Sequence, residues 1–164
     1  MDGVVIMETL FSATLWAAAI GCGLIAGVYF TFSAFVMRSL TAIPVASAVS
    51  AMDSINRVIV SSAFLPLFFG TTLASALLVG SVLLPSPATS YAAIGGVIYL
   101  VGMFICTVAF NVPLNNKLAA LDPDSEEADL FWPVYAQTWT RWNHVRTVAS
   151  TATAVLYTYA ISLT

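Results

Sequence analysis

Charged residues are scarce in this chain of 164 residues. Asp, Glu, Lys and Arg together make up 8% of it, and hydrophobic residues make up 60%. A soluble domain carries about a quarter charged residues, so this chain lacks the polar surface that would cover a globule in water. The mean hydropathy of +0.94 agrees with this deficit. The composition therefore predicts a polytopic membrane protein that is solvated by lipid.

Basic residues, histidine and cysteine are also few. Five Lys and Arg and a net charge of −3 argue against a nucleic-acid partner, which requires a basic surface. The chain has one His and no acidic residue within an apolar run, which is too few ligands for a metal site built from protein alone. Cys22 and Cys106 lie in apolar runs and are interpreted as small packing residues rather than a disulfide.

The charges that are present divide the chain into apolar runs. No charge occurs in residues 9–37, 58–116 or 147–164. Because a helix crosses the hydrocarbon with about 20 residues, the middle run has room for two crossings, and the two prolines of "LLPSPATS" separate them. We therefore predict an all-α fold, an integral membrane four-helix bundle in a single domain. The predicted spans are about 10–37, 58–84, 91–115 and 146–163.

The basic residues also predict an orientation. All five lie in or beside the first and third loops, at Arg38, Arg57, Lys117, Arg141 and Arg146. The positive-inside rule makes these two loops cytoplasmic and places both termini outside.

The first loop predicts a short amphipathic helix on the bilayer surface. Pro44 suits the first position of a helix. Beyond it, Val45, Val49 and Met52 share an apolar face, while serines and Arg57 share a polar one.

The third loop predicts a second interfacial helix. Asp124 with Glu127 resembles a capping box at its start. Aromatic residues follow at helical spacing and predict an aromatic face in the membrane: Trp132, Tyr135, Trp139 and Trp142. Pro133 is expected to break or restart this helix, and Asn143 to cap the fourth span.

Small and aromatic residues mark the first and third spans. Gly23 and Gly27 form a GxxxG pattern, which favours close packing within the bundle or a homo-oligomer. Tyr29 and Phe32 are interpreted as part of an interfacial belt or as the wall of a pocket for a flat apolar molecule. The third span carries a predicted packing stripe of Gly95, Tyr99, Gly102 and Cys106.

The scarce polar residues gather where the spans meet the first and third loops. Asn111 and Asn115 lie four residues apart, so they share a helix face, and Pro113 between them is expected to kink the helix. The full predicted cluster comprises Arg38, Asn56, Arg57, Asn111, Asn115, Asn116, Arg141, Asn143, His144 and Arg146. Facing helices of a bundle build ligand sites in this way. The alternative is that the basic residues extend to anionic lipid headgroups.

Four segments together resemble a known family of small four-helix membrane proteins. They are "GCGLIAGVYFTFSAFVM", "MDSINR", "AFNVPLNNKLAALDP" and "WTRWNHVRT", and they span residues 21–147. The chain is similar to the anthrone oxygenases, of which many members carry only a domain-of-unknown-function label. The resemblance implies an enzyme that converts an anthrone to an anthraquinone with O₂ and without an added cofactor.

The resemblance allows roles to be assigned to the cluster. An anthrone is flat and apolar, and its oxidation needs a base, an anion-binding group and a dry pocket. We expect His144 to be the base, because imidazole suits proton transfer near neutral pH. The expected anion-binding residues are Arg141, Arg146, Asn111 and Asn115. The expected substrate-binding residues are Tyr29, Phe32, Arg38, Asn56 and Trp142.

Two other function classes remain open from the residues. One is a haem protein in which His144 is a single axial ligand and arginines bind the propionates. The other is a transporter or a helper subunit without catalysis. The absence of an acid or amine at mid-membrane argues against ion coupling.

Overall fold

The computed structural model describes residues 2–83 and 86–164, and within these residues the chain is helical without strands. Its α-helices are α1 (Asp2–Thr31), α2 (Met37–Thr41), α3 (Val45–Val60), α4 (Phe64–Gly80), α5 (Pro87–Tyr99), α6 (Val112–Ala119) and α7 (Glu126–Ile161). Three π-helical segments and one 3₁₀ turn connect some of them: η1 (Phe32–Val36), η2 (Ser81–Leu83), η3 (Leu100–Ile105) and η4 (Thr107–Asn111).

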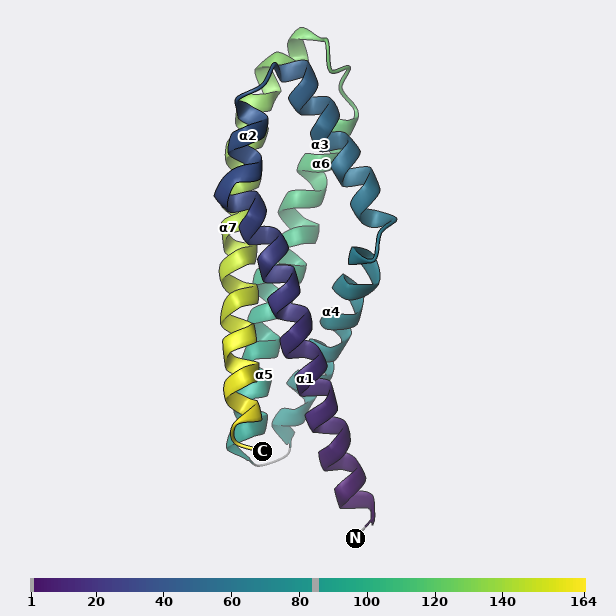
Figure 1. The fold of residues 1–164 in the computed structure, drawn as a ribbon, viewed down its shortest axis with the longest axis vertical. Helices are drawn as coiled ribbons and strands as arrows, with labels where there is room; N and C mark the ends of the chain where they lie inside the picture. Colours follow the sequence, from purple (N-terminus) through teal and green to yellow (C-terminus); the bar gives the residue numbers. More distant parts are fainter. Residues whose placement is uncertain (1, 84–85) are drawn as a thin grey trace.

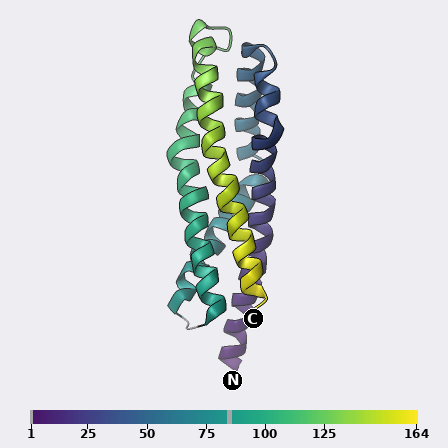
Figure 2. The ribbon, with the colours of Figure 1, turned by 90° about the vertical axis from the view of Figure 1, so that its left-hand side faces the viewer.

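These elements form long rods that lie lengthwise beside one another (Figures 1 and 2). One rod joins α1, η1 and α2, and another joins α5, η3, η4 and α6. The third consists of α3 and α4, which meet at a bend at residues 61–63. The fourth is α7, which packs mainly against α1 and α5.

Three helical stretches of the described chain are long and apolar enough to cross a membrane: Gly3–Thr41, Phe64–Leu83 and Pro87–Ala119. They confirm the first three predicted apolar spans, with different ends; residue 84 of the second prediction lies outside the described residues. The helices pass through the charges that were used as boundaries, because Lys and Arg are good helix formers. The fourth predicted span lies in α7 except for its last two residues. This helix is less apolar, and the count of four crossings stays a prediction.

The third-loop prediction is wrong in its main feature. Residues 126–161 form one continuous helix, and Pro133 lies inside it without ending it. Trp132, Tyr135 and Trp139 are at most 5% exposed and pack against side chains of η1, α2, α3 and α6 instead of facing lipid. The reason is that these three residues, spaced three and four positions apart, belong to the inward stripe of a single long helix.

The caps in this region also differ from prediction. Ser125, rather than Asp124, caps α7, and its Oγ accepts a hydrogen bond of 3.2 Å from the Ala128 N–H. Asn143 lies in the middle of α7 and is fully buried, so it caps nothing.

The first-loop helix is present as α3, with Pro44 as its N-cap rather than its first residue. The two faces of this helix differ: Val49 and Met52 are buried, and Arg57 is exposed and pairs with Asp53 at 2.8 Å. However, the apolar face packs on α2, α6 and α7. The helix is therefore part of the bundle, and that face does not rest on lipid as predicted.

Glycines show where the rods approach closely. A Cβ on Gly102 would lie 2.6 Å from Ala149 Cβ, and one on Gly95 would lie 2.8 Å from the Tyr157 ring, which confirms the predicted packing stripe. In contrast, a Cβ on Gly23 or Gly27 would meet nothing within 4 Å. The GxxxG face therefore packs against no other part of the described chain, and its role in a homo-oligomer stays a prediction.

Candidate functional site

A cavity of about 270 Å³ lies among the helices, enclosed by α1 and η1, α3 and α4, the η3–α6 rod, and α7. Its walls are mainly apolar, and seven of the lining residues are aromatic: Tyr29, Phe32, Phe64, Phe68, Phe69, Phe104 and Trp139. The polar side chains among them are those of Asn56, Thr107, Asn115 and Arg146, besides the tyrosine and tryptophan. Among the described residues that line this cavity, none is Asp, Glu or His.

Arg146 is the charged group of the cavity, and it is only 4% exposed. Its Nη2 donates a hydrogen bond of 2.8 Å to Asn143 Oδ1. Its guanidinium carbon lies 4.2 Å from the centre of the Tyr29 ring and 5.0 Å from that of Trp139. The only ion pair within residues 2–83 and 86–164 joins Arg57 to Asp53, so Arg146 is a buried cation without a carboxylate partner.

Asn143 holds this arginine in place from within the same helix. Its Nδ2 donates to the Tyr29 carbonyl oxygen at 2.7 Å and to Ser33 Oγ at 2.8 Å. These two bonds fix the amide orientation, so that Oδ1 is left to accept from Arg146. Asn143 thus connects α7 to the α1–η1 rod and positions the guanidinium over Tyr29.

Asn115 supplies a second oriented group. Its Oδ1 accepts hydrogen bonds of 2.9 Å from both the Tyr135 hydroxyl and Trp139 Nε1. Burial raises the pKa of Tyr135, which keeps that hydroxyl protonated as a donor. Because an indole N–H can only donate, the carbonyl end of the Asn115 amide is fixed toward these partners. Its NH₂ end is then the hydrogen-bonding group left for the cavity that Asn115 lines.

Half of the predicted site residues line this cavity. Tyr29, Phe32, Asn56, Asn115 and Arg146 do so, and they come from four different rods. The structure therefore brings together one predicted cation, two predicted amides and two predicted aromatic walls.

The other basic residues of the predicted cluster lie elsewhere. Arg141 and His144 are exposed on the outer side of α7, and Arg38 is exposed on α2. The expected convergence of Arg141, His144 and Arg146 does not occur. Helix geometry explains this, because residues two positions apart differ by about 200° around an α-helix.

Asn111 and Trp142 also lie outside the cavity lining. Asn111 is 1% exposed, and its Nδ2 donates to the Trp139 carbonyl oxygen at 3.2 Å, which joins η4 to α7. Trp142 stacks on Phe110 with 3.7 Å between ring centres. Both residues thus pack the contact between η4 and α7.

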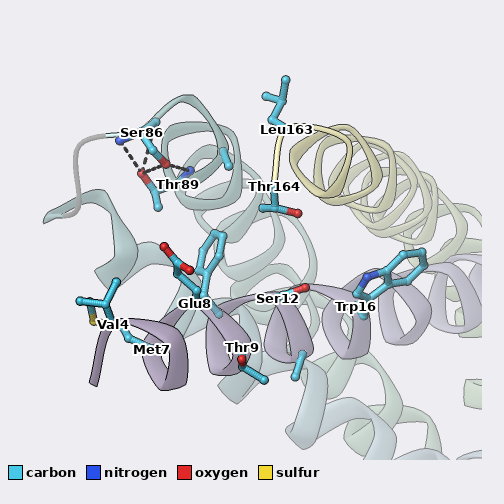
Figure 3. Close-up of a pocket in the computed structure, with 13 residues that line it drawn as sticks. Val4, Met7, Glu8, Thr9, Ser12, Trp16, Ser86, Thr89, Leu163 and Thr164 are labelled. Atoms are coloured by element: carbon cyan, nitrogen blue, oxygen red, sulfur yellow. Dashed lines mark hydrogen bonds between the residues drawn. The ribbon is translucent and has the colours of Figure 1, made fainter. Parts of the chain in front are cut away.

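A second hollow, at the far end of the rods, contains none of the predicted site residues. It is an open groove of about 810 Å³ beside the first turns of α1, and Glu8 and Trp16 are among its lining residues (Figure 3). Ser86 and Thr89 form a capping box there that begins α5. Their hydrogen bonds serve the helix start, and we assign no chemistry to this groove.

Sequence reasoning missed the roles of Asn143 and Trp139. The signal was present in their spacing, because buried residues recur along α7 at intervals of three or four: Trp132, Tyr135, Trp139, Asn143, Arg146, Ser150, Thr153, Tyr157 and Ala160. The prediction divided this segment into a surface helix and a membrane span, so these residues were not recognised as one buried face of a single helix.

The sequence profile of a protein family described as anthrone oxygenase matches residues 56–156. Asn56, Asn115, Trp139 and Arg146 lie within the matched part, whereas Tyr29 and Phe32 precede it. No curated protein and no solved structure matches the chain.

Proposed function

The chain belongs to the anthrone oxygenase family, and from this premise we propose that it oxidises a lipophilic anthrone or polycyclic phenol with O₂ in the cavity at Arg146. One observation supports this more than any other. A buried guanidinium without a carboxylate partner faces a cavity walled by aromatic rings. Such a cavity suits a flat apolar molecule that carries a negative charge on one oxygen.

The proposed reaction converts one anthrone and one O₂ to one anthraquinone and one water. Loss of a proton from the central CH₂ gives an anion whose charge lies largely on the oxygen of the carbonyl group. This anion transfers electrons to O₂, and a C–O bond forms to give a peroxide anion, which takes up a proton to become a hydroperoxide. Loss of the second C–H proton with cleavage of the O–O bond then gives the new carbonyl and hydroxide, which takes up a proton to become water.

The chain's own groups would stabilise the charged species. Arg146 would bind the anionic oxygen, and the Asn115 amide would donate to the same oxygen or to the peroxide. Donors that are already held in place in a dry site lower such barriers without reorganising. The aromatic walls would hold the ring and keep water away.

The base differs from the sequence-based expectation. His144 is exposed and does not line the cavity, so we do not assign it the proton transfer. We propose instead that Arg146 lowers the pKa of the bound substrate by favouring its anion, and that water or hydroxide accepts the proton. Each unit of that shift corresponds to about 1.36 kcal/mol of preference for the anion.

The decisive experiment uses the purified protein in detergent. Its absorption spectrum and metal content would be recorded, and O₂ uptake would then be measured with anthrone while anthraquinone is quantified. We expect equal amounts of O₂ consumed and anthraquinone formed in protein that shows no haem absorption band. A Soret band would favour the haem hypothesis with His144 as ligand. Absence of O₂ uptake with anthrones and polycyclic phenols would favour the transporter or helper class.

We also propose the predicted topology, in which residues 146–163, most of them in α7, form a fourth crossing and the first and third loops are cytoplasmic. The three apolar helical stretches support a membrane location. Labelling single cysteines at Ser47 and at Asp124 with a membrane-impermeant reagent tests it, because both positions should react from the cytoplasmic side only.

A further inference from the structure

Some residues belong both to the cavity lining and to the outer surface of the protein. Val60 and Phe69 are 56% and 54% exposed, and Val108 and Val112 are 53% and 39% exposed, yet all four line the cavity. The deep lining is different, since Tyr29, Trp139 and Arg146 are at most 5% exposed. The cavity therefore meets the exterior between the α3–α4 rod and the η4–α6 stretch.

The bend at residues 61–63 explains why an opening exists there. α3 contacts α6, whereas α4 packs mainly against α5 and α1. Figure 1 shows the α3–α4 bend bowed away from α6. The two rods thus meet above and below the bend and separate beside it.

The rim of this opening is apolar. Residues 58–116 contain no charge, and the four rim residues lie within that run. Val112 precedes Lys117 by five residues, which is about 7.5 Å along a helix. Phe69 and Val108 lie in stretches that are apolar enough to cross a membrane. Exposed apolar side chains in such stretches are favourable in contact with lipid chains and unfavourable in contact with water.

We propose that the Arg146 cavity opens sideways into the bilayer hydrocarbon, through the gap between the α3–α4 bend and η4–α6. Its ligand is then a molecule dissolved in the bilayer, which enters with its apolar part along the aromatic walls and brings its oxygen to Arg146. The nature of the ligand rests on the proposed function, but the opening itself does not.

A photoreactive lipid tests the opening directly. The protein is reconstituted in phosphatidylcholine vesicles in which some acyl chains end in a diazirine, and labelled residues are mapped by mass spectrometry after a light flash. Because the probe is tethered to a lipid, it reaches the cavity only from the hydrocarbon. We expect label on Tyr29 and Trp139. Leu73, which is 63% exposed outside the cavity, should be labelled as well, and Tyr157, which is 0% exposed, should not.

Narrowing the opening provides the matched comparison. Val108→Trp should abolish label on Tyr29 and Trp139 and leave label on Leu73 unchanged. Val101→Trp is the control, because Val101 is 57% exposed on the same rod and does not line the cavity. Val60→Trp narrows the opening from the opposite rim and should have the same effect on labelling. It replaces Val108→Trp in the experiment if that variant does not fold.

The outcomes separate this inference from the proposed function. Label on Leu73 but not on Tyr29 or Trp139 would overturn the lateral opening, as would interior label that survives both rim substitutions. Interior label in a protein that consumes no O₂ with anthrones would support the opening and contradict the proposed function. Turnover of anthrone in a protein without label on Tyr29 or Trp139 would support the proposed function and contradict the opening.

Discussion

Replacing Arg146 with Met removes the charge of the cavity while keeping much of the side-chain volume, and it should separate function from stability. If Arg146 stabilises an anionic oxygen, its loss should lower kcat by about 10²–10³, or about 2.7–4 kcal/mol, as for other preorganised oxyanion donors. Arg146→Lys keeps the charge but loses the planar fork and its stacking on Tyr29, so its activity should be intermediate.

The effect on stability should be small because two contributions oppose each other. The substitution removes a charge-assisted hydrogen bond to Asn143, worth about 1.5–3 kcal/mol, and two cation–π contacts of about 0.5–2 kcal/mol each. It also removes the cost of burying an unpaired charge, which is several kcal/mol. We therefore expect the free energy of unfolding to change by no more than about 2 kcal/mol.

The assay pairs anthraquinone formation with thermal unfolding in the same detergent. Arg141→Met is the matched control, since Arg141 lies on the same helix but is exposed, and it should keep wild-type activity. The reasoning would be refuted if Arg146→Met kept wild-type activity. A large loss of stability that fully accounts for the lost activity would also refute it, because Arg146 would then be a packing residue only.

Three further predictions concern His144, the charge of Arg146 and the close approach at Gly21. His144→Ala should leave O₂ uptake with anthrone within about twofold of wild type, since the imidazole lies outside the cavity; a large loss would restore it as the base. The pKa of bound 2-naphthol, followed by fluorescence, should be lower than in water and should rise again in Arg146→Met, because the guanidinium favours the naphtholate; equal values in both proteins would contradict this. Gly21→Ala should destabilise the protein by about 1–3 kcal/mol through contact with Thr71, whereas Gly23→Ala should not, as thermal unfolding would show.

The fold class and the first three apolar spans could be predicted because hydropathy and chain length determine what can cross a bilayer. Charges were poor guides to helix ends, however, since Arg38 and Lys117 continue their helices in α2 and α6. The course of α7 was not predictable from composition. Its polar half suggested a surface helix, but tertiary packing against Met37 and Met52 buries the tryptophans on the bundle side.

The site was predictable in its residue types more than in its geometry. Asn115 and Arg146 were expected to meet, and both line the cavity. The error lay in treating neighbours in sequence as neighbours in space. His144 and Arg146 are two positions apart, which places them on different faces of α7. Asn143 and Arg146, three residues apart, share a face and are hydrogen-bonded.

The partners of Arg146 explain how a cation can be buried and still be available to a ligand. A carboxylate would neutralise the guanidinium and compete with any anionic ligand. Asn143 Oδ1 and the faces of Tyr29 and Trp139 are neutral acceptors, which offset part of the desolvation cost without cancelling the charge. The guanidinium is thereby held in one orientation with its positive charge uncompensated. A neutral molecule crosses the apolar rim from lipid with less desolvation cost than an anion would. If it loses its proton inside the cavity, the resulting anion then pairs with the guanidinium. This is why the arginine, rather than a base, is the residue on which the proposed chemistry depends.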